Sequence, residues 1–171
     1  RYALRSLAVG LLALVLSLLA PCDAHSQQLD DPVSDARIHA GIDHVYNLAF
    51  DSAAADFQAV VTAHPDHPAG HFFLAMVDWW RIVADINATT YDERFLDELD
   101  KVVELCDARL DKNEDDVTAL FYKGGALGFQ GRLHGNRGDW IKAANAGRTA
   151  LPIVQHTYQL APTNSDVLFG I

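Results

Sequence analysis

Residues 34–67, "SDARIHAGIDHVYNLAFDSAAADFQAVVTAHPDH", set the pattern that decides the fold. Apolar residues recur every three or four positions in two runs with a short break between them, which is the spacing of amphipathic helices. The residues that share a face are Ile38, Ile42 and Val45 in the first run and Ala53, Phe57, Val60 and Val61 in the second. The spacing predicts helices over 34–47 and 53–63, the second capped by Ser52. The prolines of "HPDHP" (64–68) end the second helix, because proline does not fit inside a helix.

The rest of the chain continues this alternation of helix and short turn, and strand patterns are nearly absent. The further helices that the spacing predicts cover residues 68–87, 92–110, 117–133 and 139–160. Asp78, Arg81 and Asp85 form one polar stripe on the otherwise apolar helix 68–87, which argues against a membrane span. In the last helix, the expected packing face consists of Trp140, Ala144, Gly147, Leu151, Val154 and Tyr158. Pro152 interrupts that pattern and should kink or loosen the helix near Arg148. The pattern as a whole predicts an all-α protein.

Three turn segments, 63–75, 110–122 and 160–170, resemble one another, because each follows one helix and opens an apolar one. Recurrence of this kind is typical of a solenoid of helix pairs. Residues 34–67 also match the small, large and proline positions of one particular repeat, at Gly41, Ala53, Phe57, Val60 and Pro65. The last pair matches in part, at Gly138, Ala150, Val154 and Pro162. The chain therefore resembles a divergent tetratricopeptide repeat protein.

This resemblance implies an α-solenoid of stacked antiparallel helix pairs over 34–171. It also implies that the protein is a scaffold that binds another protein or a peptide in a groove on its concave helical face. The chain starts without methionine and stops at "DVLFGI", where another apolar helix begins. We expect further helix pairs beyond residue 171, and self-association of an isolated 27–171 segment through its end.

Residues 1–26 have the layout of a secretory signal. The elements of that layout are the cations Arg1 and Arg5, the apolar run 7–20, and the small residues Ala24 and Ser26 as cleavage points. The apolar run is shorter than the ~20 residues that span a bilayer. We expect a cleaved signal peptide, with an uncleaved N-terminal membrane anchor as the alternative. The protein would then work outside the cytoplasm (periplasmic, envelope-associated or secreted), and residues 27–33 would be an extended leader.

The net charge of −10 at pH 7 argues against nucleic acid and anionic membranes as partners of the chain as a whole. The charge is uneven, since residues 92–116 carry eleven acids and four bases, whereas residues 123–148 carry five bases and Asp139. Beyond the signal, Cys106 is the one remaining cysteine, which excludes an internal disulfide. We expect a protein or peptide partner, and membrane contact only through an uncleaved N-terminal segment.

The glycine-rich stretch "KGGALGFQGR" (123–132) does not fit a phosphate-binding loop. A P-loop needs Lys-Ser/Thr after the glycines and a strand before them, and the dinucleotide fingerprint needs a different glycine spacing. Gly124, Gly128 and Gly131 instead share a helical face, where we expect a neighbouring helix to approach closely. We expect leucine at Gly128 to be far more damaging than leucine at Gly135, which we place in a turn.

The residues that follow this stretch are candidates for binding. Arg132, Arg137 and Lys142, together with His134, are candidates to bind an anion near the start of the helix at Asp139. The alternative is a solvated turn in which Asp139 caps the helix. Trp79 and Trp80 are further candidates, with core packing as the alternative.

The motif "HPDHPAGH" (64–71) defines a second hypothesis about function. His67 and His71 lie one helical turn apart, and with His64 they are candidates to bind zinc or copper in a ligand- or metal-binding envelope protein. The alternative is a set of exposed histidines in a turn. No arrangement of nucleophile and base stands out, so we expect a non-catalytic protein without a cofactor. An enzyme whose catalytic part lies beyond residue 171 is a third hypothesis.

Overall fold

In the computed structural model of the protein, which describes residue 29 and residues 31–164, all regular structure is α-helical. The helices are α2 (Pro32–Tyr46), α3 (Phe50–Ala63), α4 (Pro68–Ala84), α5 (Asp92–Leu110), α6 (Val117–Asn136) and α7 (Trp140–Leu160). The predicted all-α class is confirmed for this part of the chain. The signal-like residues 1–26 and the apolar residues 165–171 lie outside it. None of the helices described is long and apolar enough to cross a membrane.

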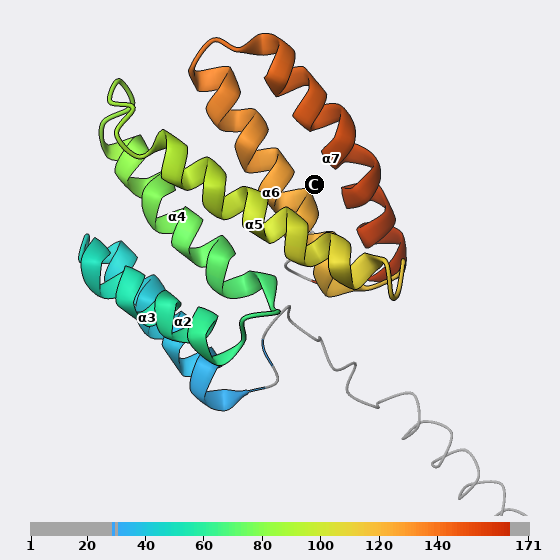
Figure 1. Cartoon of the computed structure of the whole chain (residues 1–171), viewed down its shortest axis with the longest axis horizontal. Helices are drawn as coiled ribbons and strands as arrows, with labels where there is room; N and C mark the ends of the chain where they lie inside the picture. Colours follow the sequence, from blue (N-terminus) through green and yellow to red (C-terminus); the bar gives the residue numbers. More distant parts are fainter. Residues whose placement is uncertain (1–28, 30, 165–171) are drawn as a thin grey trace, which may run out of the picture.

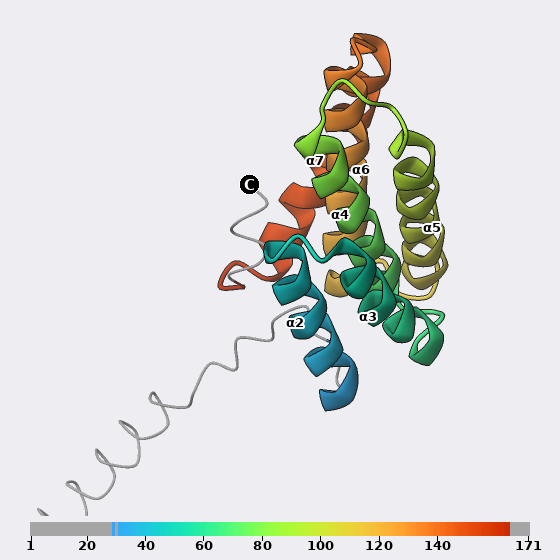
Figure 2. The same cartoon turned by 90° about the vertical axis from the view of Figure 1, so that its left-hand side faces the viewer.

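Each helix packs against the next one along the chain, so the helices form three successive antiparallel pairs (Figure 1). Helix α4 also contacts α2 and α6, which run in the same direction as α4. In Figure 2, α5 lies on one side of α4 and α6, and α2 lies on the other. Among the described residues, no helix packs across the side of α4 and α6 that faces away from α5.

Aspartate side chains cap three of these helices. The Asp31 carboxylate accepts hydrogen bonds from the Val33 and Ser34 N–H groups, so α2 already begins at Pro32 and the expected leader over 27–33 is wrong at its end. The predicted cap at Asp139 is confirmed, since its carboxylate accepts from the Lys142 N–H. The cap expected at Ser52 is wrong: α3 begins earlier, after Ala49, which provides no side-chain cap.

The core has a large and a small part. The large part joins α4, α5 and α6 around Trp79, Phe95 and Leu99. The small part consists of Ala53, Phe57 and Val77 and joins the α2–α3 pair to α4. Cys106 is fully buried, as its place on an apolar face predicted, and burial raises the pKa of its thiol to about 12. A thiol in this state is not a nucleophile at neutral pH.

The packing face expected for α7 is wrong in most of its positions. The side chains of Trp140 and Leu151 are 72% and 58% exposed, and the helix instead turns Ala150 and Thr157 inward. Apolar residues occupy almost every side of α7, so their spacing does not single out one face. Small residues lie at the contact between α6 and α7 and allow the two helices to approach closely. Helix α7 continues through Pro152.

The glycines of α6 also correct the sequence expectation. A Cβ atom added at Gly124 would lie 2.9 Å from Val154 Cγ2, and one at Gly131 would lie 3.2 Å from Ala146 Cβ, both on α7. A Cβ atom at Gly128 would meet no atom of the described residues within 4 Å, so the expectation that two helices touch there is wrong. At 100° per residue, Gly128 lies beyond the edge of the contact that Gly124 and Gly131 share.

The repeat register assigned to the last helix pair is wrong at Gly138. This residue lies in the turn between α6 and α7 with a φ of +78°, a backbone conformation that glycine adopts at no steric cost. It therefore takes no part in helix packing. The small residues that pack against the second helix of this pair are Gly124 and Gly131.

Candidate functional site

Two of the predicted binding residues, Trp79 and Arg132, come together in the structure. Trp79 is buried on α4, with its ring 5.6 Å from the ring of Phe95 and 5.4 Å from that of Phe129 between ring centroids. The exposed Arg132 of α6 reaches across, and its guanidinium carbon lies 5.2 Å from the Trp79 ring. The tryptophan is thus both a core residue and the support of a surface cation.

The neighbouring Trp80 lies on the open side of α4. Three other sides of this helix are occupied, since Gly70 approaches α3, Asp78 is bonded to α5 and Trp79 contacts α6. Successive residues of a helix are 100° apart, so these three contacts leave one side of α4 without a neighbouring helix among the described residues. The side chains on it are Met76, Trp80 and Val83. Trp80 is 46% exposed and Val83 is 44% exposed, so apolar surface remains uncovered here.

The corresponding side of α6 carries Gly128 and Arg132, one helical turn apart. Gly128 is exposed and leaves open space, as its surroundings show. We define the inner face as Met76, Trp80 and Val83 of α4 together with Gly128 and Arg132 of α6. The inner face combines exposed apolar surface at Trp80 and Val83, a recess at Gly128, and the positive charge of Arg132.

Arg132 differs from most other arginines in its electrostatic surroundings. The arginines that form ion pairs are Arg37, Arg81, Arg94, Arg109 and Arg137, each with one or more aspartates. Within the described residues, Arg132 and Arg148 form none. The chain has 23 acidic residues, and yet none of those described pairs with the guanidinium above Trp79. Arg132 can therefore accept a carboxylate from outside without breaking an internal ion pair.

Arg137 and Lys142 are used in other ways. The Arg137 guanidinium donates hydrogen bonds to both oxygens of Asp92, at 2.5 and 2.7 Å, and to the carbonyl oxygens of Ile86 and Ala88. The bond to Asp92 raises the pKa of Arg137 further. This arginine therefore ties the end of α6 to the α4–α5 loop. Lys142 lies 3.4 Å from the Asp139 carboxylate in the exposed first turn of α7.

The three histidines of the metal-binding hypothesis, His64, His67 and His71, form hydrogen bonds with different partners. His64 bonds to Asp31 and Ser34 at the start of α2, while His71 bonds to Glu98 of α5 at 2.7 Å. The ring nitrogen Nδ1 of His67 accepts the Ala69 N–H and caps α4. Among residues 29 and 31–164, no group of three metal-ligating side chains is arranged around a common point. The geometry gives the metal hypothesis no support.

His67 should make the stability of the protein fall on acidification. Burial, followed by the nearby Arg109, lowers its pKa from 6.5 to about 4. Between these values the unfolded chain binds a proton that the folded chain does not, so the free energy of unfolding decreases as pH falls from 6.5 to 4.

His67→Asn keeps a cap for α4 and removes this proton. Between pH 7 and pH 4.5 we expect the wild type to lose about 1–2 kcal/mol more than the variant in urea unfolding, a figure reduced for the partial exposure of the ring. Parallel pH curves for the two proteins would show that the ring is not held neutral by folding.

The chain matches no protein-family model, no curated protein and no solved structure. Met76 and Val83 were not identified from the sequence as candidate binding residues. Their spacing from Trp80, one turn before and one turn after it, is the signal that could have found them.

Proposed function

We propose that this protein is a non-catalytic scaffold that binds a segment of another protein on the inner face. The observation that carries the proposal is the exposed apolar surface of Trp80 and Val83 beside Arg132, a cation without an acidic partner in the described chain. Exposed aromatic residues and arginines are the residue types that contribute most to binding energy in protein interfaces. The proposed location outside the cytoplasm depends on the signal-like pattern of residues 1–26.

A divergent tetratricopeptide-like solenoid is the architecture that we propose for this scaffold. Two details support it. A Cβ atom at Gly41 of α2 would lie 2.4 Å from the Phe57 ring of α3, which is the small-against-large pair that the repeat pattern of residues 34–67 contains. Gly124 and Val154 form a similar pair between α6 and α7. The contacts of α4 with α2 and α6 place the first helices of the three pairs in one layer, the layer that bears the inner face.

The chemistry of the inner face specifies the partner segment. An apolar side chain of the partner would cover Trp80 and Val83, because removing apolar surface from water stabilises a complex by about 25 cal/mol per Å². An aspartate or glutamate would bind Arg132 in a charge-assisted hydrogen bond, which is stronger than a neutral one. Gly128, one helical turn from Arg132, leaves room for the partner backbone beside that arginine.

Selection from a random peptide library on the immobilised full chain tests the proposal. We expect selected peptides to combine an acidic residue with a nearby aromatic or branched aliphatic residue. Trp80→Ala and Arg132→Gln should each weaken their binding at least about tenfold, a loss of 1.4 kcal/mol. Both side chains are exposed, so neither change should unfold the protein.

Two matched variants control for general effects. Trp140→Ala removes an exposed tryptophan from α7, and Arg148→Gln removes the other arginine that forms no ion pair within residues 31–164. We expect both to leave peptide affinity unchanged. Peptides that bind the Trp80 and Arg132 variants as well as the wild type would contradict the proposed face.

A further inference from the structure

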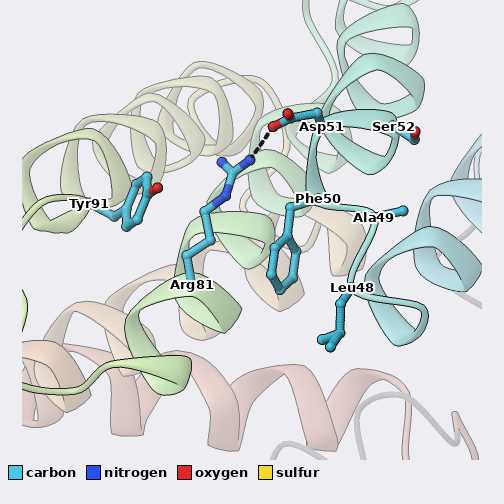
Figure 3. Close-up of a pocket in the computed structure, with 7 residues that line it drawn as sticks. All are labelled: Leu48, Ala49, Phe50, Asp51, Ser52, Arg81 and Tyr91. Atoms are coloured by element: carbon cyan, nitrogen blue, oxygen red, sulfur yellow. Dashed lines mark hydrogen bonds and ion pairs between the residues drawn. The ribbon is translucent and has the colours of Figure 1, made fainter.

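A cavity of about 340 Å³ opens where the turn between α2 and α3 meets the end of α4 and the start of α5. It is lined by Leu48, Ala49, Phe50, Asp51, Ser52, Arg81 and Tyr91 (Figure 3). Arg81 is 100° around α4 from Trp80, on the side toward α3, so this cavity is distinct from the inner face. The cavity is shallow and mostly open to solvent.

The Arg81 guanidinium lies between two aromatic rings. Its carbon is 5.5 Å from the centroid of the Phe50 ring and 5.2 Å from that of the Tyr91 ring. In Figure 3 the side chain extends between these rings toward Asp51. The guanidinium is therefore held in place by its surroundings, while its terminal nitrogens remain at the cavity.

Arg81 shares one of its two acidic partners with another arginine, and its other partner is exposed. Nη1 donates to the buried Asp78 at 3.2 Å, but Asp78 also accepts two hydrogen bonds from Arg94. The remaining partner of Arg81 is Asp51, whose oxygen lies 2.7 Å from Nη2. The Asp51 side chain is fully exposed. An ion pair with an exposed carboxylate contributes at most about 1 kcal/mol, so another carboxylate can displace it.

The rim of the cavity adds an apolar contact. Leu48 has a φ of 59°, a left-handed conformation that is costly for a leucine and usually taken by glycine at the end of a helix. This turn holds the Leu48 side chain 75% exposed beside the cavity. Together with Phe50 and Tyr91, it provides apolar walls around a cation.

We propose that this cavity binds a small carboxylic acid with an aromatic or branched aliphatic substituent. The ligand carboxylate replaces that of Asp51 on Arg81, where the planar guanidinium can donate two parallel hydrogen bonds. The substituent lies against Phe50, Tyr91 and Leu48. In the absence of ligand, Asp51 occupies the place of the ligand carboxylate and acts as an internal competitor.

Titration of the full chain with phenylacetate, followed by NMR, tests this proposal, with phenylacetamide as the uncharged control. We expect phenylacetate to bind with a millimolar or lower Kd and phenylacetamide not to bind. Asp51→Asn removes the competitor, so it should increase the affinity for phenylacetate several-fold. Arg81→Gln should abolish binding, and Trp80→Ala should leave it unchanged.

The Asp51 variant keeps the test decisive if Arg81→Gln fails to fold, because Asp51 is fully exposed and its loss disturbs no core contact. Phenylacetate that fails to bind the Asp51→Asn protein would overturn the proposal. An affinity that is unchanged or lower in this variant, or equal binding of the amide, would overturn it as well. Failure here leaves the proposed inner face untouched, since that test uses Trp80 and Arg132.

Discussion

Replacing Phe57 by alanine is expected to lower the free energy of unfolding by about 3–5 kcal/mol. The Phe57 ring is 1% exposed, stacks on Phe73 of α4 with 5.1 Å between centroids, and fills the space beside Gly41 of α2. It therefore joins three helices at once. A smaller side chain would leave a cavity that the α2–α3 pair cannot close without losing its contact with α4.

Urea unfolding measures this loss, and Tyr46→Ala on the same helix pair is the control. Tyr46 is 78% exposed, so its replacement should change stability by less than about 0.5 kcal/mol. A loss below about 1 kcal/mol for Phe57→Ala would contradict the packing of this pair on α4.

Leucine at two glycines of α6 should change stability in opposite directions. At Gly124 the first added carbon alone would lie 2.9 Å from Val154, so Gly124→Leu should push α7 away and cost about 1–3 kcal/mol or more. At Gly128 the side chain would enter open space, and leucine has the higher helix propensity. Gly128→Leu should therefore be neutral or stabilise the protein by up to about 1 kcal/mol.

The same urea experiment measures both variants. Equal destabilisation by the two substitutions would contradict the contact between α6 and α7. The Gly128→Leu variant also distinguishes an effect on binding from an effect on stability, because its leucine lies on the inner face. It should weaken peptide binding in a protein that is at least as stable as the wild type.

Helix positions could be predicted because the breaks between them are local. Pro68 begins α4 and the run of acids and asparagine after Leu110 ends α5, and both boundaries agree with the structure. Which side of a helix meets which neighbour is decided by residues far away in the sequence. Gly124 and Gly128 look equivalent in the sequence, and only the position of α7 distinguishes them.

The candidate site shows the same limit. Arg132 and Arg137 lie five residues apart in one basic stretch, and the sequence offers no reason to treat them differently. The fold places Asp92 beside Arg137 and leaves Arg132 above Trp79. The ion pair of Arg81 with Asp78 joins two residues of the polar stripe that lie one helical turn apart. The second partner of Arg81, Asp51, is thirty residues away and could not be inferred.

Site-specific photo-crosslinking in the cells that make the protein tests the inner face most directly. Benzoylphenylalanine would replace Val83 on the inner face or, as a control, Gln58 at an exposed position of α3. We expect one protein to be crosslinked from position 83 and not from position 58. Arg132→Glu should abolish that crosslink and Arg148→Glu should not. Equal crosslinks from both positions, or a crosslink from position 83 that persists with Arg132→Glu, would contradict binding at the inner face.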